Sequence, residues 1–164
     1  MTEDGFVLTL NEDGQSYTLS DFLADESQTK IVIPDKYHKL PITAIGNLAF
    51  SACKHLISIT LPNTLVSIGE AAFGNCTNLN FVIIPDGVTT IQGGAFMGCE
   101  KLADITIPNS VTNIGILTFL LCENLTNITF DGTKEQWNAI QKGLDWDDST
   151  GPYTIHCIDG DIKK

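Results

Sequence analysis

The hydrophobic residues of the chain recur at one fixed spacing, which leads from Ile45 to Ile68, Ile91 and Ile114. Seven positions, nearly all apolar, hold this register over four successive units, with no insertion between units. The aromatic position is held by Phe50, Phe73, Phe96 and Phe119, and the cysteine position by Cys53, Cys76, Cys99 and Cys122. Self-similarity at a fixed spacing of this length indicates a solenoid, in which stacked units bury one continuous core.

Each unit predicts one coil with two extended sides. The first side is a short strand of the pattern L-x-x-I-x-I, as in Leu56, Ile59 and Leu61, which buries alternate residues and ends at a proline. The second is a short alternation such as 88–91. A glycine then turns the chain, and A-F-x-x-C packs inward as a tight turn or a single helical turn. We therefore expect a leucine-rich-repeat solenoid, a right-handed coil of mainly short strands, over residues 28–132.

Atypical sequences at both ends predict caps, which solenoids need to cover their end coils. Residues 1–27 contain two strand patterns around Asp13-Gly14 and predict a β-hairpin. The first coil, after Pro34, carries a five-residue insertion around residues 36–40. The ends of the solenoid are therefore expected to differ in local structure from its four regular units.

The segment 133–164 is expected to cap the C-terminal end with a short helix, a loop and a final strand at 153–157. Thr133 is a candidate helix N-cap with Gln136 three residues later. Trp137 stands one full repeat after Ile114, so we expect it to continue that core column.

The charge of the chain limits its partners. The formal net charge is −11, which disfavours nucleic acid, because binding phosphate needs clustered Lys and Arg. It also disfavours docking on anionic lipid. No apolar run approaches the ~20 residues that span a bilayer, so no membrane insertion is expected. The N-terminal residues have no apolar signal-peptide core, which favours either a cytosolic protein or a trimmed piece of an exported one.

The residues that could carry catalysis or hold a metal are better explained by structure. The four repeated cysteines form a line, which cannot make a tetrahedral zinc site, and we expect buried reduced thiols. The three histidines, His38, His55 and His156, are far apart in the repeat. Acids at 145–148 could attract calcium but lack the spacing of a calcium loop, so a solvated cap is the simpler interpretation. We expect no cofactor, no metal and no catalytic residue.

The outward-facing positions of the repeat strands form the best candidate binding surface. Two columns are expected to face solvent: Lys30, Ser58, Phe81, Asp104 and Asn127, and beside them Val32, Thr60, Ile83, Thr106 and Thr129. Most are small and polar, as on a solvated sheet. Phe81 and Ile83 are large and apolar, and within this polar rim they are typical of a binding or dimerisation patch. The alternative is that the N-terminal insertion or a curved edge covers them.

The repeat resembles the BspA-like leucine-rich repeat. The motif I-x-I-P-x-x-V-x-x-I-G-x-x-A-F-x-x-C-x-x-L is present from Ile105, and the ending around Trp137 and 155–160 resembles that family's terminus. The resemblance covers residues 28–162. It implies a solenoid often found on the surface of host-associated microbes, where adhesion or protein binding is the usual proposal and no catalytic residue is shared.

Two functions stay open from the sequence. The first is a non-catalytic protein-binding or adhesion module that uses the exposed face of the repeat sheet, with Phe81 and Ile83 at its centre. The second is a passive structural or weakly self-associating segment of a larger protein. An enzyme is disfavoured, because a thin solenoid has no deep cleft, and Asp104 is nearly alone as an acid on the sheet.

Overall fold

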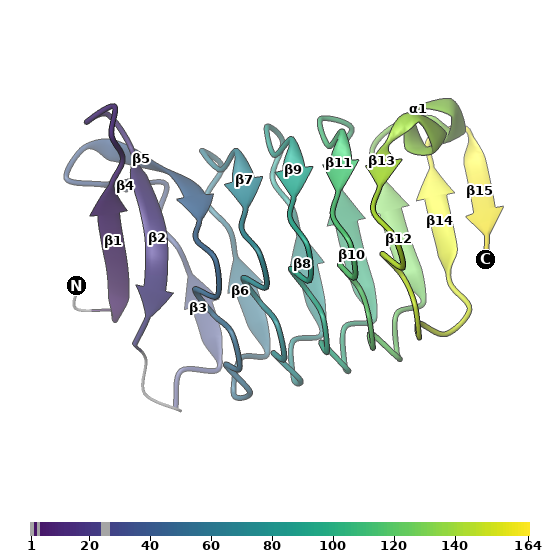
Figure 1. Ribbon diagram of the computed structural model, residues 1–164, viewed down its shortest axis with the longest axis horizontal. Helices are drawn as coiled ribbons and strands as arrows, with labels where there is room; N and C mark the ends of the chain where they lie inside the picture. The colour runs from purple at the N-terminus through teal and green to yellow at the C-terminus, as the bar shows by residue number, and fades with distance from the viewer. Residues whose placement is uncertain (1, 3, 24–26) are drawn as a thin grey trace.

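The repeat unit folds into a flat coil with one strand on each side, and about six such coils stack into a solenoid (Figure 1). The structure is a computed structural model that describes residues 2, 4–23 and 27–164. The N-terminus and the C-terminus lie at opposite ends of the stack. The expected solenoid is confirmed, and its two layers are two sheets whose strands run across the long axis.

The L-x-x-I-x-I segments form the first layer, called sheet B here. Its strands pair in the order β15-β14-β12-β10-β8-β6-β3. They are β3 (Lys30–Val32), β6 (Ser58–Thr60), β8 (Phe81–Ile83), β10 (Asp104–Ile107), β12 (Asn127–Phe130), β14 (Thr154–Cys157) and β15 (Gly160–Lys163). All neighbours are parallel except β14 and β15, which form an antiparallel hairpin. Parallel pairing follows from the coil, because each turn returns the chain in the same direction.

The second extended sides form the other layer, sheet A, with the order β1-β2-β5-β7-β9-β11-β13. In Figure 1 its strands β7, β9 and β11 lie in front of sheet B. Its elements are β1 (Phe6–Leu10), β2 (Tyr17–Phe22), β4 (Lys36–Tyr37), β5 (Leu40–Ile45), β7 (Ser67–Ile68), β9 (Thr90–Ile91), β11 (Asn113–Ile114) and β13 (Gln141–Lys142). The expected N-terminal hairpin is the antiparallel pair β1–β2, and the insertion in the first coil is the small hairpin β4–β5.

The A-F-x-x-C segments are tight turns that connect sheet A to sheet B. Each corner has two residues with positive φ, one just before this segment and one within it, such as Leu117 (φ 55°) and Leu121 (φ 62°). Backbone hydrogen bonds join successive corners, for example from the Phe73 N–H to the Ala95 carbonyl at 2.8 Å. The corners therefore form a third hydrogen-bonded side of the stack.

A continuous stack of aromatic rings runs along the core of the solenoid. The four repeated phenylalanines stack at centroid distances of 5.2, 5.4 and 5.6 Å. Phe22 extends this stack at one end, and Trp146 extends it at the other, with its ring centroid 5.9 Å from that of Phe119. Each repeated ring is 0% exposed. Stacking one aromatic ring per coil gives every pair of neighbouring coils the same buried contact.

The C-terminal cap differs from the sequence-based expectation. Helix α1 (Lys134–Ala139) starts with the expected capping box at Thr133 and Gln136. Trp137 is buried but does not continue the Ile114 column; that prediction was wrong, because Lys142 pairs with Ile114. The helix adds residues to this coil, so the next sheet A strand starts later than the period predicts.

Residues 141–164 also hold more structure than a loop and one strand. They form β13, a further corner around Trp146, and the hairpin β14–β15. In Figure 1 this hairpin and α1 close the C-terminal end. Within the described part of the chain, no helix has the length and apolar character needed to cross a membrane.

Candidate protein-binding surface

The register of sheet B places the predicted surface residues in two columns. Ser58 pairs with Phe81, which pairs with Asp104, and Asp104 pairs with Asn127. The second column continues from Ile83 through Thr106 to Thr129, with Thr60 ahead of it on β6. The hairpin at the C-terminal end extends both columns by Thr154 and His156. The eight candidate residues therefore lie on one side of one sheet.

Phe81 and Ile83 are uncovered on this face. Phe81 is 44% exposed and Ile83 is 60% exposed, so neither the first-coil insertion nor sheet curvature hides them. Val32, which heads the second column, is also exposed. Ser58, Thr106 and Asn127 are half-buried, and the other polar candidates are exposed. The apolar side chains gather toward the N-terminal half of the face.

The pairing between β6 and β8 is much shorter than that of its neighbours. Only Ser58 and Phe81 pair there, whereas β3–β6 and β8–β10 each pair three residues. A hollow of about 180 Å³ lies where pairing stops, and Phe81, Ile83 and Thr60 contribute to its lining. Ile59, Leu61, Asn63 and Pro85 complete that lining. Sheet B thus has an apolar recess at the point where its exposed hydrophobic residues stand.

The other half of the face carries a chain of polar contacts. The Asn127 amide donates to Asp104 at 2.8 Å, and its oxygen lies 3.3 Å from His156 Nε2. His156 Nδ1 lies 3.0 Å from an Asp161 oxygen on β15. These contacts order side chains across four strands. The face therefore joins an apolar half to a polar half whose side chains contact one another.

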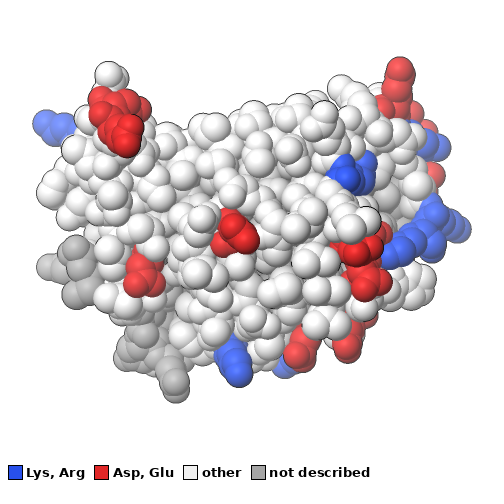
Figure 2. Space-filling model, in the orientation of Figure 1, with Lys and Arg blue, Asp and Glu red and all other residues white. Residues whose placement is uncertain are grey.

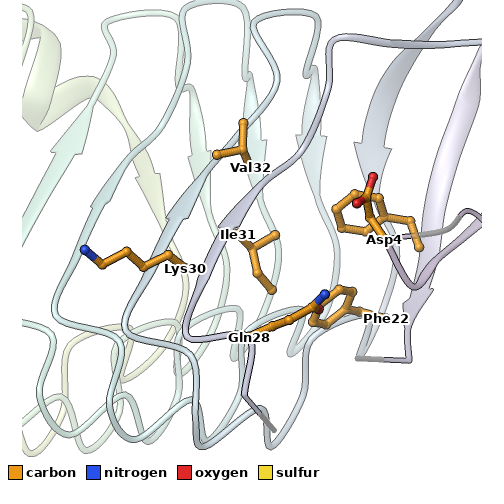
Figure 3. A pocket seen from close by; sticks show the side chains of 7 residues that line it. Asp4, Phe22, Gln28, Lys30, Ile31 and Val32 are labelled. Carbon is orange, nitrogen blue, oxygen red and sulfur yellow. The ribbon is translucent and has the colours of Figure 1, made fainter. Parts of the chain in front are cut away.

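A second pocket lies at the N-terminal end of sheet B, beside its edge strand β3. Its volume is about 240 Å³, and Figure 3 shows Ile31 pointing toward Phe22, with Lys30 pointing the other way. The pocket exists because sheet A has one more strand at this end, β1, than sheet B.

Lys30 on β3 and Lys163 on β15 place a charge on each edge strand of sheet B, which opposes pairing with another chain.

The repeated cysteines are structural. The thiols of Cys76, Cys99 and Cys122 donate to carbonyls of Phe50, Phe73 and Phe96 at 3.1, 3.1 and 3.2 Å. Burial is the main cause that raises their pKa, to about 12 for Cys76 and Cys122. All five cysteines are free. Thiols held neutral in this way are poor nucleophiles and poor metal ligands.

The acids of the C-terminal cap have separate partners. Asp147 accepts from the Tyr153 hydroxyl at 2.5 Å and pairs with Lys164 at 2.9 Å, while Asp159 accepts from the Lys134 N–H at 2.8 Å. Over the described residues, no group of three or more His, Cys, Asp or Glu side chains could hold a metal ion.

On the sheet A side, Figure 2 shows Lys side chains near the ends and the lower edge, without a basic patch across the face.

Residues 20–142 match the family model of the BspA-type leucine-rich repeat region, in six copies. The chain belongs to the BspA-type leucine-rich repeat family. Members of this leucine-rich repeat family are typically protein-binding or adhesion modules and are generally not enzymes. The family match shows neither a partner nor a binding site.

Solved structures of bacterial leucine-rich repeat proteins are similar to this BspA-type chain. One from Bacteroides capillosus has a TM-score of 0.71 and 28% identity, over 80% of this chain and 98% of that one. One from Bacteroides ovatus has a TM-score of 0.68 and 26% identity, over 88% of this chain and 40% of that one. The T. pallidum leucine-rich repeat protein has a TM-score of 0.68, 24% identity, and coverage of 88% and 81%. No curated protein matches the sequence.

Sequence reasoning missed part of the BspA-type solenoid's surface. Val32 belongs to the outward column but is not among the candidate patch residues, and no sequence pattern connects His156 with Asn127. A further apolar surface lies on the corners, where Ile116, Leu121 and Leu144 are exposed. The signal is in the sequence: these positions of the repeat hold small or polar residues in most other coils.

Proposed function

We propose that this chain is a non-catalytic protein-binding module whose contact surface is the outer face of sheet B. The observation that supports it is the exposure of Phe81 and Ile83 side by side over a hollow. Large apolar side chains at the centre of a polar rim are the usual anchors of protein interfaces. The stack does not require them, because Val82 on the same strand and Ile84 just after it fill the core at this coil.

The polar half of the face supplies specificity in this proposal. Asp104, Asn127 and His156 are already held by one another, so a partner that contacts them orders few additional side chains. Preorganisation lowers the entropy lost on binding. Ser58, Thr60, Thr106 and Thr129 form the rim around the apolar centre, where truncation is expected to cost little.

The test is quantitative binding of the intact chain and its variants to a panel of purified extracellular and cell-surface proteins. The double variant Phe81→Ala/Ile83→Ser is expected to bind a partner at least about tenfold more weakly. The matched control Thr129→Ala, on the same face, is expected to bind within about threefold of the original chain. Equal binding by the double variant and the original chain would contradict a sheet B interface.

Light scattering on the same proteins tests the alternative of a self-associating segment. The proposed interface predicts that the free chain is a monomer at assay concentrations. A dimer that the Phe81→Ala/Ile83→Ser substitution abolishes would instead assign this patch to self-association.

A further inference from the structure

The corners of the coils form a second, mainly apolar surface on another side of the solenoid. Backbone hydrogen bonds hold successive corners side by side, such as Ala71 N–H to the Gly93 carbonyl at 3.0 Å and Leu117 N–H to the Leu144 carbonyl at 3.3 Å. The corner segments are 47–52, 70–75, 93–98, 116–121 and 144–149. Side chains on this surface are therefore spaced by one coil, about 4.8 Å.

Large aliphatic side chains stand exposed at both ends of this corner surface. Leu48 is 61% exposed near the N-terminal end, and Ile116 and Leu144 are 55% and 76% exposed near the other. Leu121 adds a fourth exposed aliphatic residue. None of these side chains is needed by the core, because Phe50, Phe119 and Trp146 take the core positions of the same corners. Several exposed aliphatic side chains on one surface are typical of an interaction site.

Short side chains between these residues leave a groove. Ala71, Gly93 and Gly94 form its floor, while Leu48 stands on one side and Ile116 on the other. Two hollows of about 210 and 170 Å³ lie along it, and both are lined by Ala71 and Glu70. Because they share this wall, the hollows lie one to two coils apart, or about 5–10 Å.

Every charged side chain within the corner segments is acidic, and one of them, Asp147, is paired with Lys164. The five corner segments contain no Lys, Arg or His. Glu70 is exposed at the groove, and Asp145 and Asp148 are exposed on the last corner, where the Leu121 N–H donates to the Asp148 carbonyl. A second copy of the chain is disfavoured as the occupant, because it would place acidic residues against acidic residues and has the same net charge of −11. Anionic lipid is repelled for the same reason.

We propose that this groove binds a basic amphipathic helix of a protein partner. Such a helix presents apolar side chains four residues apart, about 6 Å along its axis, which matches the separation of the two hollows. Its Lys and Arg side chains would lie over Glu70, between the hollows, and over Asp145 and Asp148 on the last corner. This surface is separate from the outer face of sheet B, so the inference does not depend on the function proposed above.

The test uses a fluorescent helical peptide of Leu and Lys, with leucines at positions i, i+3, i+4 and i+7. A matched peptide has the same lysines with every Leu replaced by Ser. Binding to the intact chain is followed by fluorescence anisotropy at about 0.05 M and about 0.3 M salt. The Leu/Lys peptide is expected to bind, more weakly at the higher salt, and the Ser/Lys peptide to bind at least about tenfold more weakly.

The decisive variant is Ala71→Leu, which fills both hollows without removing a charge or an exposed apolar group. The fold accepts leucine there, because Leu48 and Leu117 occupy the equivalent position with φ of 60° and 55°, close to 48° at Ala71. We expect Ala71→Leu to weaken peptide binding at least about tenfold. Phe81→Ala/Ile83→Ser serves as the folded control that leaves the groove intact, and it should bind the peptide as the original chain does.

A second variant tests the charges. Glu70→Gln/Asp148→Asn is expected to weaken binding and to reduce its dependence on salt. Unchanged binding by Ala71→Leu, or equal binding of the two peptides, would overturn the groove. A dimer seen by light scattering and lost in Ala71→Leu would assign the groove to a second copy and overturn the proposed occupant.

Discussion

Replacing Phe96 by alanine probes the stacked core at its centre. Phe96 is 0% exposed and lies between Phe73 and Phe119, with ring centroids at 5.4 and 5.6 Å. The ring therefore belongs to two coil interfaces at once. In a solenoid, stability is approximately a sum of coil terms and nearest-neighbour interface terms. Phe96→Ala weakens two neighbouring interface terms, which makes it a severe single change.

The magnitude follows from the buried ring. A Phe side chain that buries about 150–250 Å² contributes roughly 4–6 kcal/mol at about 25 cal/mol per Å², and alanine retains part of this. Measured costs of Phe→Ala in cores are about 3–5 kcal/mol, because a cavity remains. We therefore expect the free energy of unfolding to fall by about 4 kcal/mol. Phe96→Leu keeps most of the volume and should cost about 1.5 kcal/mol.

Urea unfolding measures this loss with two probes. Far-UV circular dichroism reports the whole stack, whereas fluorescence reports Trp137 and Trp146, which both lie at the C-terminal end. With a slope of about 2 kcal/mol per molar urea, a loss of about 4 kcal/mol moves the midpoint by about 2 M. Phe81→Ala, on an exposed ring, is the matched control and should cost less than about 1 kcal/mol. A loss below about 1 kcal/mol for Phe96→Ala, or one equal to the control, would refute the stacked core.

Two further predictions concern the same coils. Burial raises the pKa of the Cys76, Cys99 and Cys122 thiols, to about 12 for Cys76 and Cys122. The three neutral thiols therefore contribute fully to stability below the pKa of an unfolded cysteine, which is about 8.5. As the pH rises from there toward about 12, the free energy of unfolding falls by about 4 kcal/mol per pH unit for the three thiols together. Urea unfolding with a reductant between about pH 7.5 and 10 measures this, and a variant with all three changed to alanine should lack that extra slope. Gly94→Ala should lower the free energy of unfolding by about 1–2 kcal/mol, because Gly94 has a φ of 63°, which strains any residue with a Cβ. Steric overlap adds nothing to this cost, since the added Cβ would meet no atom closer than 3.8 Å. No loss of stability in urea unfolding would show that this corner relaxes.

The regular part of the fold was predictable because its spacing never changes. With a strict period, Phe81, Asp104 and Asn127 must fall in one column, and the paired strands place them there. The buried stack of phenylalanine rings follows from the same fixed spacing, which relates Phe50, Phe73, Phe96 and Phe119. What periodicity could not show is how much of Phe81 and Ile83 stays uncovered. That depends on whether another segment of the chain covers them, which tertiary packing decides.

The C-terminal cap was less predictable because α1 changes the length of its coil. Lys142 takes the place beside Ile114 that a strict period assigns to Trp137, so this coil is longer than the regular ones. Trp137 is still buried, since it packs on Phe130 at 5.2 Å and on Trp146 at 6.0 Å. The sequence showed a buried aromatic residue but not its place, because a helix and a strand advance the chain by different distances per residue.

Departures from the repeat mark the two binding surfaces that we propose for this chain. A position that serves the stack must suit every neighbouring coil, so selection for stability alone keeps it uniform. Phe81 and Ile83 on sheet B, and Ile116 and Leu121 on the corners, are large apolar residues at positions that other coils fill mainly with small or polar ones. Exposed apolar side chains add little to stability and raise the risk of aggregation. Their presence on two separate faces is what the two proposed binding surfaces predict.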